Sequence, residues 1–455
     1  MDNTIIRGYL ERQGYRPPAG AGEARLTEHL NWYRGYVGDF HDYWMRVGTS
    51  RRKLTRYRLG LAKTVCEDYA TLLLNEKVQI HAEGFEALAT ILNRNAFMER
   101  ANRLVEWTMA LGTGAFVEFL DGAGQPAVDY IRADRIFPLR WEGDHITECA
   151  FGSRRALPDG ADGYYVQLHT RQAGGYGIRN VWLDAGGAEL PPPEGVAAQA
   201  GPSPVPLFQI LRPNTVNALD PDSPMGLSVF AMAIDQLKAA DLVFDSYVNE
   251  FVLGKKRVMV PQSLASIEMQ QDGTLQPVFD PSDVLFYVYR QSQDGDDTLR
   301  PLDMTLRAAE HEAALQRMID LVSKKCGLGT GRYRFESGAA RTATEVISEQ
   351  SDLYQSLKRN EKPLERALLG LTDALSWLSG GPAEVKTHVA FDDSIIEDVG
   401  ATAERTLRLV NNGLKSRKRA IMELTRCSEA DAEQMLREIA AEQTGTYTAT
   451  APAAE

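Results

Sequence analysis

The sequence predicts an α+β fold, because helical and strand patterns occupy separate parts of the chain. Two strong helical patterns, Arg307–Val322 and Thr342–Leu378, flank a short glycine-rich break, Cys326–Gly331. Between Ala115 and Leu211, apolar and polar residues alternate in the way typical of half-buried strands. With 455 residues, of which 44% are hydrophobic, the chain is long enough for two or three domains.

Helices are predicted for the start of the chain, up to about Ile80. An apolar stripe at helical spacing supports one of them: Leu61, Val65, Tyr69, Leu72 and Leu73. A further helix from Phe97 to Leu111 is expected to end at Gly112, because glycine suits the C-terminal cap of a helix.

Turn signals divide the strand region. The run Phe116–Leu120 stops at Asp121-Gly122, which predicts a hairpin with the strand that follows. Further strands are expected at Tyr164–Leu168 and Val181–Leu183. The segment Pro191–Pro206 is rich in Pro, Ala and Gly, so we expect a surface loop there.

A helix is predicted from Ser228, as its N-cap, to Val252. Its apolar side is expected to consist of Val229, Met232, Ala233, Leu237, Ala240, Phe244, Val248 and Phe251. Its more polar positions are Asp235, Asp241, Asp245 and Glu250. A strand at Val258–Val260 should follow. The next segment, Gln262–Asp303, is strongly acidic and contains the apolar run Val284–Tyr289, so a small α/β unit with one buried strand is expected.

Towards the C-terminus, Thr342 is a good N-cap for the long helix, and Glu345 completes a capping box. After a break at Gly380–Pro382, a strand is expected at Val385–Phe391. Three helices should then follow, the last of them capped by Ser428. Their predicted bounds are Thr402–Val410, Ser416–Thr425 and Glu429–Glu442.

The chain is acidic, with a formal net charge of −12. This charge argues against a protein that binds nucleic acid by broad phosphate neutralisation. It is compatible with a protein that surrounds DNA without holding it, and equally with general solubility. The four cysteines form no CxxC pair, which indicates a reduced, intracellular protein without a zinc site: Cys66, Cys149, Cys326 and Cys427. A signal peptide and a run of roughly 20 apolar residues are both missing, so no membrane association is expected.

Motifs for catalysis are also missing. The Gly327–Gly331 cluster is not a P-loop, and the histidines have no HExxH spacing. A metal cluster at Asp392, Asp393 and Asp398 is conceivable, but a polar turn after a strand explains these residues more simply. Ser228 lacks the second glycine of a nucleophile elbow. We therefore expect no enzyme, no cofactor and no metal.

Short motifs occur in a recognisable order along the chain. They are Asn31–Gly35, Leu61–Glu76, Ala110–Ala115, Asp134–Pro138, Pro224–Val229, Thr342–Val346, Asp392–Asp398 and Gly413–Ser416. Together they resemble the portal proteins of tailed bacteriophages, in particular the siphophage-type portals of Gram-positive hosts.

The resemblance implies a portal-type α+β subunit with a wing, a long-helix stem, a small α/β clip and a helical crown. Its parts on this chain would be the wing (1–225, a helical start and then a β-rich part), the first stem helix (226–254), the clip (255–304), the second stem helix (305–328), the tunnel loop (329–341), the long wing helix with its return strand (342–398), and the crown with a mobile tail (399–455).

The resemblance also implies a function. Portal subunits form a ring, typically of twelve copies, at one capsid vertex, and double-stranded DNA passes through it during packaging and ejection. The implied partners are the terminase large subunit, a head-completion or tail adaptor, and the major capsid and scaffolding proteins. The location would be the virion, and the host cytoplasm during assembly. The alternatives are a gene-transfer or domesticated prophage portal, or an acidic monomeric scaffold or enzyme.

Three sets of residues are candidates for these contacts. In the tunnel loop, Arg332, Arg334 and Arg341 would face DNA, or would pair with carboxylates where subunits meet. Glycines 329, 331 and 338 would make this loop mobile. On the first stem helix, the subunit contacts would include Phe244, Val248 and Phe251. On the clip, four acidic residues would face the motor and the adaptor: Asp272, Asp294, Asp296 and Asp297.

Overall fold

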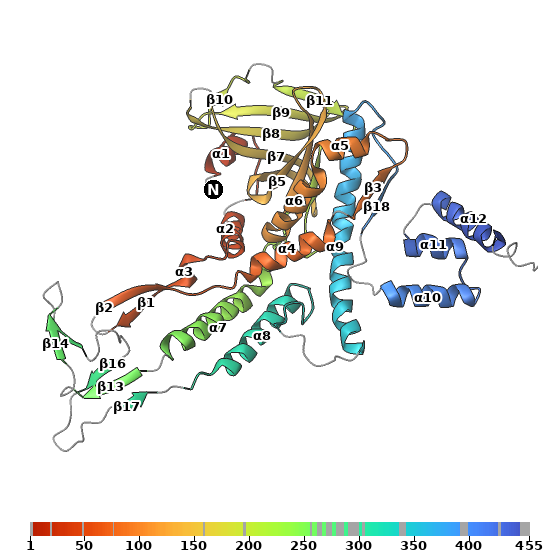
Figure 1. Cartoon of the computed structure of the whole chain (residues 1–455). Coiled ribbons are helices and arrows are strands. Elements are labelled where there is room, and N and C mark those ends of the chain that lie inside the picture. The colour runs from red at the N-terminus through yellow and green to blue at the C-terminus, as the bar shows by residue number, and fades with distance from the viewer. Residues whose placement is uncertain are drawn as a thin grey trace, which may run out of the picture. The chain divides into compact units, whose positions relative to one another are not determined.

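The computed structural model describes residues 3–18, 21–47, 50–75, 77–157, 160–193, 197–254, 257–261, 266–269, 275–278, 286–289, 300–302, 305–335, 343–391, 399–425 and 429–445. The chain is a mixed α+β protein with two compact units, Met1–Ala390 and Phe391–Glu455 (Figure 1). Within the described ranges, no helix is long and apolar enough to cross a membrane.

The first unit starts with short helices and one hairpin. Their bounds are α1 Thr4–Arg12, α2 Ala21–Tyr33, α3 Gly38–His41, β1 Asp42–Val47, β2 Ser50–Thr55, α4 Leu61–Leu73, β3 Gln79–Ala82, α5 Leu88–Arg94 and α6 Phe97–Leu111. The predicted helices at 61–73 and 97–111 are present as α4 and α6. The predicted helical start is wrong at 42–55, where β1 and β2 form an antiparallel hairpin. Tyr43, Trp44 and Thr55 favour strands.

The strand region forms two antiparallel sheets. The larger has the order β10-β9-β8-β7-β6, with β11 also paired to β9, and the smaller has the order β12-β4-β5. Their strands are β4 Gly114–Leu120, β5 Pro126–Arg132, β6 Ile136–Glu142, β7 His145–Ala156, β8 Asp162–Gln172, β9 Gly175–Leu183, β10 Glu189–Leu190, β11 Gln199–Ser203 and β12 Phe208–Leu211; a short 3-10 turn, η1 Ala133–Arg135, joins β5 to β6. The hairpin predicted at Asp121-Gly122 is confirmed as β4–β5. The prediction of a loop at 191–206 is wrong at β11, which is a strand. β11 lies exposed at the edge of its sheet, where Pro202 can be accommodated because no second neighbouring strand among the described residues needs its missing N–H.

Two apolar clusters fix these sheets. In the first, α1 packs on the larger sheet through Ile6, Tyr9 and Leu10, which contact Phe137 and Val166 among others. In the second, the smaller sheet meets β6 and β7 through buried residues: Ala115, Val117, Ile136, Ile146, Cys149, Phe151 and Phe208. The two sheets and α1 therefore share a continuous body.

Two antiparallel helices lead into and out of a group of short strands. The helices are α7 Ile234–Leu253, preceded by a 3-10 turn η2 Ala231–Ala233, and α8 Ala308–Lys325. The strands are β13 Arg257–Pro261, β14 Ser266–Met269, β15 Leu275–Val278, β16 Phe286–Tyr289 and β17 Arg300–Leu302. β13 pairs parallel with β16 and antiparallel with β17. The strand predicted at 258–260 is present as β13, and the strand predicted at 284–289 is present over its described part, 286–289, as β16. The predicted helical part of this α/β unit has no counterpart in the described residues of 255–304.

The long helix α9, Ala343–Leu378, has 36 residues, so it is about 54 Å long. Its predicted extent is confirmed, while its predicted cap, Thr342, lies outside the described residues. One face is buried at helical spacing: Leu357, Leu364, Leu368, Leu371 and Leu375. This face packs on β12, β4 and α4. The chain then returns through β18 Thr387–Ala390, which pairs with β3 and confirms the predicted strand.

The second unit contains three helices, as predicted. Their bounds are α10 Val399–Asn411, α11 Arg417–Thr425 and α12 Glu429–Gly445. Lys418 of α11 pairs with Glu433 of α12 at 2.6 Å. The predicted cap Ser428 and the Asp392, Asp393 and Asp398 group lie outside the described residues.

Candidate interaction surfaces

The start of α7 is positioned by a close contact between two glycines. Gly112 follows α6 with φ +85°, and a Cβ atom there would lie 2.5 Å from the Gly226 carbonyl oxygen. Gly226 N–H donates to Thr113 Oγ1 at 2.9 Å, and Val229 N–H donates to the Met109 carbonyl at 3.0 Å. Two of the sequence motifs, Ala110–Ala115 and Pro224–Val229, thus meet in space.

The predicted helix start at Ser228 is wrong, because η2 intervenes and α7 begins at Ile234. Ser228 is buried, and its Oγ accepts a hydrogen bond from Phe230 N–H at 3.3 Å. The hydroxyl therefore stabilises the turn that precedes α7 rather than the helix itself.

Two of the four polar positions of α7, Asp241 and Asp245, are turned inward, whereas the side chain of Asp235 is exposed. Asp241 and Asp245 are buried, with 6% and 7% of their surface exposed. Asp241 accepts hydrogen bonds from Leu59 N–H at 2.9 Å and lies 3.0 Å from Nε2 of the buried His41. Asp245 accepts a hydrogen bond from Tyr57 N–H at 3.0 Å. The two carboxylates, one helical turn apart, therefore attach the segment after β2 to α7. In the sequence, the only sign of this attachment is that the two aspartates are spaced i, i+4 on a largely apolar helix.

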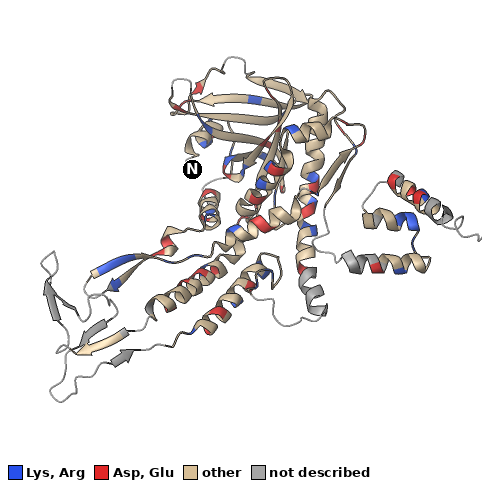
Figure 2. Ribbon diagram, viewed as in Figure 1, with Lys and Arg blue, Asp and Glu red and all other residues tan. Residues whose placement is uncertain are grey.

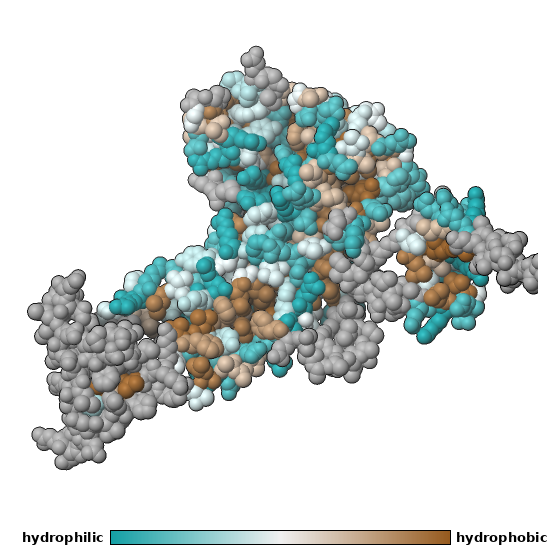
Figure 3. All heavy atoms as spheres, viewed as in Figure 1, coloured by the Kyte–Doolittle hydropathy of each residue, from teal (hydrophilic) through white to brown (hydrophobic). Residues whose placement is uncertain are grey.

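Several apolar residues of α7 remain partly exposed, although Leu237 and Ala240 near its start are buried. Phe251 is 46% exposed and Leu242 is 47% exposed. An open apolar groove is lined by Phe244, Tyr247, Val248, Phe251 and Val252. Figure 3 shows hydrophobic residues gathered over α7 and α8. The structure thus places the three predicted contact residues, Phe244, Val248 and Phe251, together in one groove, although their role as subunit contacts stays a prediction.

The far end of the α7–α8 pair is held by Glu250. Its carboxylate accepts hydrogen bonds from the backbone N–H, Nε and Nη2 of Arg307, the last at 2.8 Å. The Arg307 guanidinium lowers the pKa of Glu250 to about 2. Tyr247 stacks on His311 with the ring centroids 5.8 Å apart. Both ends of α7 are therefore held by specific contacts, so the helix that carries the apolar groove is fixed in position.

The predicted tunnel loop begins at a polar junction. Tyr69 of α4 donates a hydrogen bond to the Cys326 carbonyl at 2.6 Å, and its hydroxyl oxygen lies 2.8 Å from Ser356 Oγ of α9. Gly327, Gly329 and Gly331 all have positive φ, which only glycine adopts without strain. These glycines therefore allow the backbone angles of the turn. The mobility predicted for residues 329 and 331 stays a prediction.

Of the three predicted tunnel arginines, two are described. Arg332 is paired with Asp68 of α4, with Nε 3.0 Å from Oδ2 and Nη2 3.3 Å from Oδ1. Arg334 is exposed. Arg341 lies outside the described residues, as do Asp272, Asp294, Asp296 and Asp297. The pairing of Arg332 is thus with a carboxylate of its own chain, which the sequence did not indicate.

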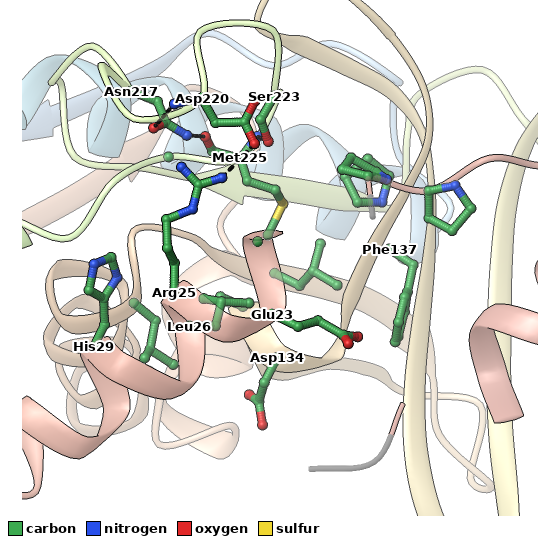
Figure 4. A pocket seen from close by; sticks show the side chains of 18 of the residues that line it. Glu23, Arg25, Leu26, His29, Asp134, Phe137, Asn217, Asp220, Ser223 and Met225 are labelled. Carbon is green, nitrogen blue, oxygen red and sulfur yellow. Dashed lines mark hydrogen bonds and ion pairs between the residues drawn. The ribbon is translucent and has the colours of Figure 1, made fainter. Parts of the chain in front are cut away.

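A small cavity lies between α2, the η1 turn and the loop that precedes α7 (Figure 4). Its charges are paired: Arg25 donates to Asp220 at 2.6 Å, and Arg7 pairs with Glu23 at 2.5 Å. Burial lowers the pKa of His29 to about 4, so this histidine is neutral near pH 7. In the described part of the chain, no three His, Cys, Asp or Glu residues are grouped as metal ligands. The cavity is therefore a packing junction.

A model of the family described as "Phage portal protein, SPP1 Gp6-like" matches residues 202–445. No curated protein matches the chain. Among solved structures, the chain is similar to one titled "Neck of native GTA particle computed with C12 symmetry", with 16% identity, a TM-score of 0.36, and coverage of 80% of this chain and 89% of that chain. It is also similar to one titled "Virion of native gene transfer agent (GTA) particle", with 14% identity, a TM-score of 0.37 and the same coverage, 80% and 89%.

Proposed function

This chain belongs to the SPP1 Gp6-like phage portal protein family, and we propose from this premise that it forms a ring at one capsid vertex through which double-stranded DNA is packaged and ejected. The family is structural and not catalytic. The proposed ring has twelve copies, and the proposed location is the virion.

The observation that best supports assembly is the orientation of α7. A helix of a monomer is expected to bury its apolar residues and expose its carboxylates. α7 instead buries Asp241 and Asp245, whereas Phe251 and Val252, which line its groove, are 46% and 45% exposed. Full burial of such apolar side chains contributes roughly 1.5–3 kcal/mol each, so covering their exposed halves contributes about 1 kcal/mol per residue. A neighbouring copy that covers this groove would stabilise every interface of a ring.

The α7–α8 pair would be the stem, and the strands between the two helices the clip. We assign residues 226–254 and 305–328 to the stem, 255–304 to the clip, 329–341 to the tunnel loop and 399–455 to the crown. The acidic clip would meet the terminase large subunit and the tail adaptor, and the outer surface would meet the capsid and scaffolding proteins. A portal of a gene-transfer or domesticated prophage particle would use the same surfaces.

The test is the native mass of the purified full chain at micromolar concentration, with negative-stain images. A ring with a central opening is expected. Phe251→Asp should shift the mass towards monomer, because a carboxylate would have to be buried without a partner. Val216→Asp is the matched control, because Val216 is also an exposed apolar residue but lies in the loop between β12 and η2 and does not line the groove.

A monomeric wild-type chain under these conditions would refute the ring and favour the acidic scaffold. If the wild type is a ring and Phe251→Asp leaves it intact, the ring stands and the contact face is wrong.

A further inference from the structure

The β1–β2 hairpin concentrates positive charge in an acidic chain. Arg46, Arg51, Arg52 and Lys53 are all exposed, and Asp42 is its only carboxylate. Figure 2 shows Lys and Arg gathered on this hairpin, whereas on the helices of the first unit both signs are interspersed. We call the hairpin, residues 42–55, the basic ribbon.

The register divides the basic ribbon into two different faces. Trp44 lies opposite Lys53, and Arg46 lies opposite Arg51. Because cross-strand partners share a face, as do alternate residues of one strand, these four side chains form one surface. Arg52 belongs to the other face, opposite Met45.

The base of the ribbon is fixed. Asp42 accepts hydrogen bonds from Thr55 Oγ1 at 2.8 Å and from Tyr36 Oη at 2.7 Å, and it forms an ion pair with Lys53 Nζ at 2.7 Å. The Arg56 guanidinium lies over the Tyr43 ring, 4.5 Å from its centroid. Together with the bonds from Tyr57 and Leu59 to α7, these contacts support the end of the ribbon that joins the body. Arg46 and Arg51 at the other end are therefore carried by a hairpin whose base is held in position.

We propose that the face of the basic ribbon that carries Trp44, Arg46 and Arg51 binds the phosphate backbone of duplex DNA. Duplex DNA carries one charge per about 1.7 Å of its axis, so it meets several cations of one face at once, and a two-stranded ribbon fits its major groove. Trp44, 66% exposed, adds a donor N–H and an apolar ring for the sugars. The inference rests on the proposed function for the identity of the polyanion, and it adds a contact outside the predicted tunnel loop.

An acidic protein surface is the competing partner. The carboxylates of α7 that bond to the segment after the ribbon, Asp241 and Asp245, are buried and already bonded, so they do not supply such a surface. The acidic segment 262–303 of a second copy is one candidate for such a surface. If the ribbon bound this segment, assembly of the ring would depend on the ribbon. If the ribbon bound DNA, assembly would not depend on it.

The test measures the affinity of the full chain for a duplex of about 30 base pairs as a function of salt concentration, with native mass recorded for each variant. Each lost phosphate contact lowers the slope of log K against log salt by about 1. Arg51→Gln should therefore lower the slope by about 1, and the double variant Arg46→Gln/Arg51→Gln by about 2. Arg52→Gln removes the same charge from the next residue but from the opposite face, and should leave the slope unchanged.

Equal slopes for wild type and the double variant would overturn the proposal, and so would an Arg52→Gln effect as large as that of Arg51→Gln. A double variant that loses ring mass while its DNA slope is unchanged would identify the second copy as the partner. A wild-type chain that binds DNA through this face yet stays monomeric would leave the ribbon assignment intact and refute the ring.

Discussion

Gly112→Ala tests the junction that sets the start of α7. The substitution adds one methyl group at a position with φ +85°, where it would lie 2.5 Å from the Gly226 carbonyl oxygen and 2.8 Å from the Leu227 carbonyl carbon. The left-handed backbone costs alanine roughly 1–2 kcal/mol. Moving a backbone carbonyl out of the way costs about 1–3 kcal/mol more, as in other overpacked sites. We expect a loss of about 3 kcal/mol.

Gly84→Ala separates these two effects. Gly84 also has a positive φ, +75°, but a Cβ atom there would meet nothing within 4 Å. Only the backbone effect remains, about 1 kcal/mol.

The assay is urea unfolding followed by circular dichroism. With a dependence on urea of about 3 kcal/mol/M, the midpoint should fall by about 1 M for Gly112→Ala and by about 0.3 M for Gly84→Ala. If the two variants lose the same stability, the Gly112–Gly226 contact does not constrain the fold and the reasoning is refuted.

Two further predictions concern buried charge and the loop. Glu118 is fully buried, and burial raises its pKa well above the usual value; folding therefore becomes less favourable as pH rises above about 4.3, the unfolded value. Glu118→Gln should raise the urea midpoint at pH 8 more than at pH 5, and an equal change at both pH values would count against this. Replacing Arg332, Arg334 and Arg341 by glutamine should leave the mass of the ring unchanged and lower the packaging yield. Asp68→Asn, which releases Arg332 without removing it, should not lower the packaging yield. Unchanged packaging in intact triple-variant rings would place the arginines outside the DNA path.

The sequence predicted the elements whose pattern is local. The extent of α9 followed from its apolar spacing and its break at Gly380, and the β4–β5 hairpin followed from Asp121-Gly122. The basic ribbon was missed because its strands are short and largely exposed, so no alternation of burial marks them. Its clustered arginines and exposed Trp44 were the available signal.

The role of the acidic residues of α7 could not be predicted in the same way. Asp241 and Asp245 bond to Leu59 and Tyr57, more than 180 residues away, so only the folded chain reveals that they are internal. The candidate groove was predicted in part, because Phe244, Val248 and Phe251 recur at helical spacing. Which side of α7 faces solvent depends on those distant partners.

The Tyr69 hydroxyl has a mechanical consequence. This single group connects the carbonyl that ends α8 to the side of α9, and it is carried by α4. A load applied to the loop after α8 therefore reaches α4 and α9 as well as α8, and α9 continues from Ser356 for about 33 Å and packs on the strands β12 and β4. A force on the loop after α8 is therefore shared by α4, α8 and α9 rather than carried by the loop alone.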